Sequence, residues 1–90
     1  MARKRSRTYS MGFRVAVDDA TRAEWAQRLR AARVARAMTQ AQLADTLGCT
    51  RAAVSAWERG INTPTPEVRR MIARTLKRPA SRLFPEHVAA

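Results

Sequence analysis

The sequence of 90 residues is poor in the residue types from which active sites are built, with one cysteine, one histidine and seven acidic residues. The lone Cys49 has no partner for an intramolecular disulfide, and the lone His87 has no second imidazole to join it. No glycine-rich loop followed by Lys-Ser or Lys-Thr is present. We therefore expect no catalytic residues, no bound metal and no cofactor, and hence a protein that is not an enzyme.

Long hydrophobic runs are also absent, although 46% of the residues are apolar. Without such a run the sequence offers no candidate for a signal peptide or a membrane-spanning helix. A single cysteine fits a reducing compartment, in which we expect Cys49 to pack as a small hydrophobic side chain. The sequence thus predicts a cytoplasmic protein that makes no membrane contact.

What the sequence does have is positive charge. The sequence has eighteen lysines and arginines against seven acidic residues, which gives a net charge of +11. Sixteen of those bases are arginine. The guanidinium group of arginine matches phosphate with two parallel hydrogen bonds and stacks on bases. A polyanionic partner is the first hypothesis, and a solvated basic surface without a partner is the alternative.

The first 17 residues differ in pattern from the rest. Residues 1–8 hold four bases and no acid, which predicts a basic arm formed by Arg3, Lys4, Arg5 and Arg7. Residues 9–17 alternate apolar with polar or small side chains, as a half-buried strand does. Such a segment either packs on the helices or pairs with its equivalent in a second copy. We expect residues 1–17 to be this arm and extended segment, residues 18–86 the folded domain, and residues 87–90 a tail.

From Asp18 onward the apolar spacing becomes helical. Thr21 and Glu24 have the spacing of a capping box, so we expect a first helix that runs to about Ala37. Its apolar face contains Trp25, Leu29 and Ala32, and it displays five arginines. They are Arg22, Arg28, Arg30, Arg33 and Arg36.

Two short helices follow in close succession. Thr39 is the expected cap of a helix over 40–47, Gly48 ends it in a left-handed conformation, and Thr50 caps the next helix over 51–59. Two helices joined by about three residues that include a glycine are typical of a helix-turn-helix. Gly60 ends the third helix. A fourth begins at Thr65 and Pro66 with an apolar stripe of Val68, Met71, Ile72 and Leu76, and a short fifth turn covers the core with Leu83 and Phe84.

The helix over 51–59 has two unlike faces. Val54, Trp57 and Glu58 fall on one side, and Ile61, just past its end, continues in that direction toward the core. The other side carries small residues between two arginines, Arg51 and Arg59. Small side chains permit close approach, so this side suits the DNA major groove, which is wide enough to admit a helix.

Residues 38–60, MTQAQLADTLGCTRAAVSAWERG, resemble the helix-turn-helix of the Cro/lambda-repressor-like (XRE) family, whose pattern is T-Q-x-x-L-A, then G, then a capped helix ending W-E-x-G. The resemblance spans about residues 25–84. It implies an all-α fold, a compact five-helix lambda-repressor-like bundle with the basic extended segment before it. It also implies that the third helix lies in the major groove of double-stranded DNA.

The resemblance assigns roles to individual positions. Base contacts fall on Arg51, Ala52 and Ala56, and a structural ion pair on Arg33 and Glu58. Phosphate contacts fall on Gln40, Ser55 and Arg59, and Asn62 and Thr63 in the following loop are candidates for more. Two of the three base positions are alanine, which can only touch a thymine methyl group. Direct readout would then rest on Arg51, and the remainder on DNA shape or on the N-terminal arm in an adjacent groove.

Three functions fit these features. The leading one is a nucleoid-associated, sequence-specific regulator, most simply a homodimeric repressor that binds a palindromic operator. A second is the antitoxin of a toxin–antitoxin pair, which represses its own operon and holds a toxin protein through residues 9–17. A third, of another class, is RNA binding through the arginine-rich helix over 21–37.

Overall fold

The computed structural model describes residues 17–86, which fold into five α-helices, and no strand occurs among these residues. The helices are α1 (Asp19–Ala35), α2 (Gln40–Leu47), α3 (Arg51–Glu58), α4 (Pro66–Leu76) and α5 (Ala80–Leu83). The expected all-α five-helix bundle is thus confirmed. The basic arm, the alternating segment before Val17 and the tail over 87–90 lie outside the described residues, so these three predictions stay untested.

Helix α1 begins earlier than expected, and the predicted capping box of Thr21 and Glu24 is wrong. The N-cap is Asp18, whose Oδ1 accepts a 2.8 Å hydrogen bond from the backbone N–H of Thr21. Thr21 is itself buried against the bundle. Both residues are good N-caps by type, and the burial of Thr21 decides between them because it draws that residue into the helix.

The other starts follow the sequence closely. Thr39, Thr50 and Thr65 each accept a hydrogen bond from the backbone N–H three residues on, at 3.0, 3.1 and 3.3 Å. At α2 the bond is reciprocal, because the side chain of Gln42 accepts from the backbone N–H of Thr39. This is a complete capping box. Pro66 occupies the first turn of α4, where its missing N–H costs nothing.

Four of the helices end in the same way, with one residue in the left-handed conformation. These residues are Ala37, Gly48, Gly60 and Lys77, with φ between 56° and 74°. In each case the next residue donates its N–H back five residues, as Met38 does to Arg33 at 3.2 Å, which is the bond of a Schellman motif. The glycines at 48 and 60 were expected there. Helix α1 stops at Ala35 rather than near Ala37 because Ala37 takes this conformation.

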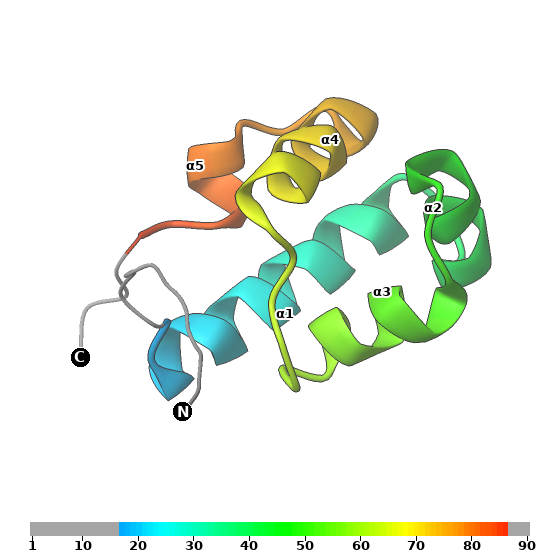
Figure 1. Cartoon of the computed structure of the whole chain (residues 1–90). Coiled ribbons are helices and arrows are strands. Elements are labelled where there is room, and N and C mark those ends of the chain that lie inside the picture. The colour runs from blue at the N-terminus through cyan, green and yellow to red at the C-terminus, as the bar shows by residue number, and fades with distance from the viewer. Residues whose placement is uncertain (1–16, 87–90) are drawn as a thin grey trace.

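Helix α1 runs through the middle of the bundle, with α4 and α5 on one side of it and α3 on the other (Figure 1). Five core side chains are almost fully shielded from solvent: Leu29, Leu43, Val54, Ile72 and Leu76. Trp25 packs edge-to-face against Phe84 with ring centroids 5.3 Å apart, and its Nε1–H donates to the carbonyl of Pro85 at 2.6 Å. Leu83 and Phe84 are buried, so the expected cover over the core is confirmed.

The apolar stripe of α4 is narrower than its sequence suggested. Ile72 and Leu76 are fully buried and Val68 packs partly against the core. Met71 is only half-buried and lies outside the core cluster, so its assignment to the buried stripe is wrong. It is one residue from Ile72, about 100° around the helix, and therefore sits at the edge of the buried face.

Gly48 and Ala37 occupy the same position of the same motif, so they form a mirrored pair of test sites. We expect Gly48→Ala to lower the free energy of unfolding by about 1 kcal/mol, because a Cβ is disfavoured in the left-handed region. A Cβ at Gly48 would meet nothing within 4 Å, so the change would report backbone conformation alone. Ala37→Gly should raise the free energy of unfolding by a similar amount. Urea denaturation measures both, and a Gly48→Ala variant as stable as the parent would contradict the assignment.

Candidate nucleic-acid interface

Helix α3 has one face in the bundle and one in solvent. Val54 has no exposed surface, and Trp57 is half-buried and packs against the core cluster. Arg51 and Ala52 are exposed, whereas Ser55 and Ala56 are half-exposed. The bulky side chains therefore anchor the helix and the small ones form its outer surface, as the spacing predicted.

Ile61 departs from that prediction. It was expected to continue the core-facing direction past the end of α3, but 59% of its surface is exposed. The reason is Gly60, whose left-handed backbone (φ 72°) reverses the chain before Ile61. Helical spacing does not apply beyond such a residue.

The two ends of the outer face of α3 carry long basic side chains. Arg51 is the first residue of α3, and Arg59 is the residue that caps its last turn. The Nε of Arg59 lies 3.4 Å from the carbonyl of Ser55, so its side chain folds back along the helix. The outer face is thus a surface of small side chains with a positive group at each end.

A buried ion pair fixes α3 against α1. The guanidinium of Arg33 donates through Nε and Nη2 to the two carboxylate oxygens of Glu58, at 2.6 and 2.9 Å. The side chains are 11% and 3% exposed. The surface pattern of the first helix suggested that Arg33 is displayed to solvent. The structure instead buries it together with Glu58. The hydrogen bonds to Glu58 raise the pKa of Arg33 above its usual value, although burial acts in the opposite direction.

This pair is extended by two further groups. A third N–H of Arg33 donates to the carbonyl of Met38 at 2.6 Å, and Gln40 Nε2 donates to Glu58 at 3.1 Å. Gln40 is the first residue of α2 and remains half-exposed. The network therefore joins α1, the start of α2 and the end of α3, and it holds the Gln40 amide beside the last turn of α3.

The remaining predicted contact residues lie in the loop after α3. Asn62 is exposed and Thr63 is half-exposed, and both follow Arg59 within four residues. Their short polar side chains are therefore within reach of solvent on the same end of α3 as Arg59. Gln40 thus belongs to the network, whereas Asn62 and Thr63 follow the end of α3 that the network holds.

The sequence matches the helix-turn-helix family HTH_3 over residues 29–83, which is more than half of the chain. The chain belongs to this family. The match begins inside α1 and ends at the last residue of α5, so it includes the whole network around Glu58. Membership identifies the chain as a DNA-binding transcriptional regulator of helix-turn-helix type.

Solved structures with the same fold include regulators of this type. The P22 c2 repressor in complex with synthetic operator 9T is 27% identical, with a TM-score of 0.65, over 70% of this chain and 96% of that one. The restriction-modification controller protein C.AhdI from Aeromonas hydrophila is 31% identical, with a TM-score of 0.67, over 72% and 94%. The hypothetical transcription factor NHTF from Neisseria is 28% identical, with a TM-score of 0.68, over 81% and 86%. No curated protein matches the chain.

One member of the network, Met38, and one residue that supports it, Gln42, were not predicted from the sequence. The carbonyl of Met38 takes part through its backbone, so no side-chain type announces it. The capping box of Gln42 with Thr39 does have a signal, since T-x-x-Q is the spacing of that motif. Gln42 stabilises the start of α2 and so helps to hold Gln40 in place.

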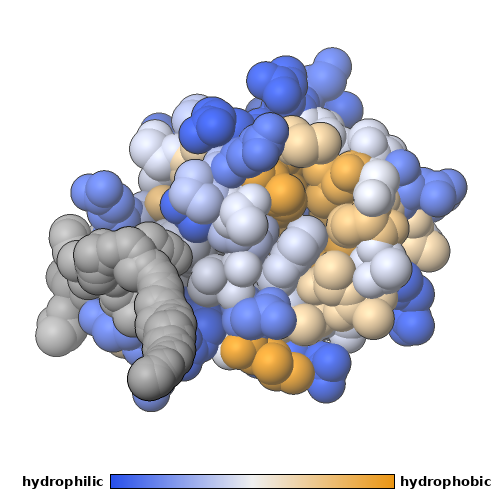
Figure 2. All heavy atoms as spheres, in the orientation of Figure 1, coloured by the Kyte–Doolittle hydropathy of each residue, from blue (hydrophilic) through white to orange (hydrophobic). Residues whose placement is uncertain are grey.

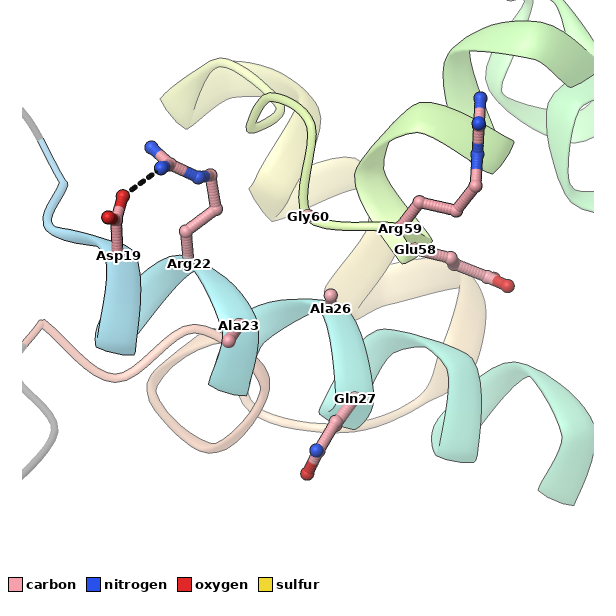
Figure 3. Close-up of a pocket in the computed structure, with 8 residues that line it drawn as sticks. All are labelled: Asp19, Arg22, Ala23, Ala26, Gln27, Glu58, Arg59 and Gly60. Carbon is pink, nitrogen blue, oxygen red and sulfur yellow. Dashed lines mark hydrogen bonds and ion pairs between the residues drawn. The ribbon is translucent and has the colours of Figure 1, made fainter.

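A shallow hollow lies between α1 and the end of α3 (Figure 3). Its volume is about 450 Å³. The Arg22–Asp19 ion pair closes one side of the hollow, and Ala23 and Ala26 form its wall on α1. The side chain of Arg59 extends away from the hollow. The lining contains no cysteine, histidine or hydroxyl group, and its two carboxylates, Asp19 and Glu58, are both engaged in ion pairs.

Other kinds of site find no support among residues 17–86. No group of three or more metal-ligating side chains occurs there. Cys49 is half-buried, and burial raises the pKa of its thiol, which keeps it in the less reactive neutral form. No helix within this range is long and apolar enough to cross a membrane.

Glu58 and Glu24 allow a matched test of the ion pair, because each carboxylate binds an arginine of α1. We expect Glu58→Ala to lower the free energy of unfolding by about 3 kcal/mol, since it leaves the buried Arg33 charge uncompensated. Glu24→Ala removes the partner of Arg28 at the surface and should cost less than about 1 kcal/mol. Denaturant titration compares the two, and equal decreases would show that the Arg33–Glu58 pair is not shielded.

Proposed function

We propose that the protein is a sequence-specific repressor that binds double-stranded DNA as a homodimer on a palindromic operator. Helix α3 (Arg51–Glu58) lies in the major groove in this proposal. The observation that supports this proposal is that α3 has two different faces. One is buried and bulky, and the other faces solvent and carries small side chains with an arginine at each end. A helix of this shape fits the groove, and its charges lie where the groove is lined by phosphates.

The proposed readout assigns different work to the two kinds of residue on α3. Arg51 contacts a guanine through O6 and N7, and Ala52 and Ala56 contact thymine methyl groups or exclude other bases. Phosphate contacts come from groups around this face, since such contacts set the register of the protein on DNA. They are Gln40, Ser55, Arg59, Asn62 and Thr63.

Gln40 has support from its position as well as its type. One N–H of its amide is taken by Glu58, and the residue stands half-exposed at the N-terminus of α2. Its second amide N–H and the backbone N–H groups of the first turn are further donors at this point of the surface. The start of a helix attracts phosphate because its N–H groups and its dipole both favour an anion.

Dimerisation is part of the proposal because one module of this size buries limited surface on DNA. Two α3 helices related by a two-fold axis would meet half-sites about 34 Å apart. The basic arm of Arg3, Lys4, Arg5 and Arg7 would reach an adjacent groove, and residues 18–86 would be the DNA-binding domain of a cytoplasmic, nucleoid-associated protein. No catalytic role belongs to the proposal.

Two alternatives remain open. An antitoxin would repress its own operon through the same face of α3, and the gene beside its own would encode the toxin. RNA binding through residues 21–37 is less well supported, because Trp25 and Arg33 are buried and Arg22 and Arg28 are engaged in ion pairs. Gel shifts with duplex DNA and hairpin RNA at matched salt discriminate the two nucleic acids.

Selection of bound fragments from a random duplex library tests the main proposal. We expect the enriched fragments to share a palindromic site with half-sites one helical turn apart. Enrichment of a single unrepeated half-site would contradict the homodimer, and no enrichment over input would contradict sequence-specific binding.

Arg51 and Arg59 form a matched pair at opposite ends of α3. Arg51→Ala should weaken binding to the selected site by about 1–3 kcal/mol and relax the preference at one base pair in each half-site. Arg59→Ala should weaken binding to all duplexes alike and reduce the salt slope by about 0.9 for each phosphate that the variant no longer neutralises. Fluorescence anisotropy over a salt series measures both, and uniform weakening by Arg51→Ala would remove that residue from base readout.

A further inference from the structure

The positive charge of the described residues is concentrated away from α3. Helix α3 and its cap present two exposed bases, Arg51 and Arg59. The segment from α4 to α5 presents five. They are Arg70, Arg74, Lys77, Arg78 and Arg82, all exposed. The proposed DNA-binding helix is therefore not the most basic surface of the folded domain.

None of these five bases forms an ion pair within residues 17–86. The carboxylates of Asp19, Glu24 and Glu58 bind arginines of α1, namely Arg22, Arg28 and Arg33. Arg69, the neighbour of Arg70, lies over the Trp25 ring at 4.8 Å from its centroid. The structure thus uses those arginines for folding, whereas the five exposed bases keep their charge directed at solvent.

Three of the five bases form a row along α4 and its C-cap. Arg70 and Arg74 are one turn apart, opposite the buried Ile72 and Leu76, and Lys77 follows as the C-cap of the helix. Like charges at this spacing destabilise a helix. The helix dipole favours Arg74 in the last turn and Lys77 at the C-cap, but it gives no benefit at Arg70, in the middle of the helix. Folding alone does not explain the row.

The row lies on the opposite side of α1 from α3. Figure 1 places α4 above α1 and α3 below it, and Figure 2 shows hydrophilic side chains gathered over the upper surface. A duplex in contact with the outer face of α3 would therefore not reach the row without bending around the domain. A two-fold contact with a second copy is also unfavourable, because it would bring identical positive patches face to face.

We propose that Arg70, Arg74 and Lys77, with Arg78 and Arg82 beside them, bind the phosphate backbone of a second segment of double-stranded DNA. The contact reads no sequence, because long flexible bases on a convex helix face reach phosphates rather than base edges. This inference rests on the proposed function, since α3 must hold the first segment. The protein then joins two duplex segments, one bound by sequence and one by charge.

A two-duplex capture assay tests this proposal with the full chain. Beads carry the selected operator duplex in excess over protein, so that α3 is occupied, and a fluorescent duplex without the operator is then added. The test variant is Arg70→Gln/Arg74→Gln. The control is Arg30→Gln/Arg36→Gln, which removes the same charge from exposed positions on α1 and its C-cap.

We expect the parent protein and the α1 control to retain the fluorescent duplex. The α4 variant should bind it about tenfold more weakly or worse, because a phosphate contact that rests on counterion release contributes a factor of about eight at 0.1 M salt. Its affinity for the operator should change no more than that of the control. Equal weakening in both variants, or unchanged capture by the α4 variant, would overturn the inference.

The two proposals fail in different ways in this assay. If the parent protein binds no duplex with sequence preference, the proposed function fails, and the operator beads stay empty. If the beads load with protein but retain no second duplex, only the inference about α4 fails. Circular dichroism of both variants excludes unfolding as the cause, since neither substitution touches the core.

Discussion

The bidentate contact between Arg33 and Glu58 is the constraint on which the rest of the arrangement depends. It joins the last turn of α1 to the last turn of α3, and Gln40 and the carbonyl of Met38 complete it. A buried ion pair contributes little net stability compared with apolar packing, but it is costly to break and strict in its geometry. Its effect here is to fix where α3 lies relative to α2, which is the relation a helix-turn-helix must hold.

The hydrophobic core is small, and it fixes α3 in a second way. Val54 and Trp57 attach α3 to the same cluster as Leu29 and Leu43. Helix α3 has only eight residues, too few to be stable alone in water. Its helical conformation therefore depends on packing, the Thr50 cap and the Glu58 network together. The side chains of its outer face are not needed to hold the helix in place. Alanine and serine can stand there at no cost in stability.

Much of this fold could be predicted because its signals are local. Thr39, Thr50 and Thr65 bond to backbone groups three residues away, so their types and spacing suffice. The errors arose where tertiary contacts decide. Thr21 and Asp18 compete as caps until burial is known, and Ala37 adopts a glycine-like conformation with no glycine to announce it.

The same distinction separates what could be foreseen of the site. The two faces of α3 follow from helical geometry, and so Val54, Ala52 and their neighbours were placed correctly. Ile61 was not, because periodicity ends at Gly60. The pairing of Arg33 with Glu58 came from family resemblance, since two residues 25 positions apart carry no spacing signal. The resemblance also implied that Gln40 braces α3, but its partner, Glu58, required the fold itself.

The distribution of side chains on the two sides of the bundle points to a division between selectivity and affinity. The outer face of α3 has small side chains and one arginine at its start, so it offers few hydrogen bonds to bases. Its discrimination between DNA sequences is therefore limited. Affinity for nucleic acid depends mainly on the number of phosphates neutralised, and most unpaired bases of the described chain lie on α4 and α5 instead. A second duplex segment held there would raise the local concentration of DNA around α3. The domain would then gain occupancy of its site without any added contact to the bases.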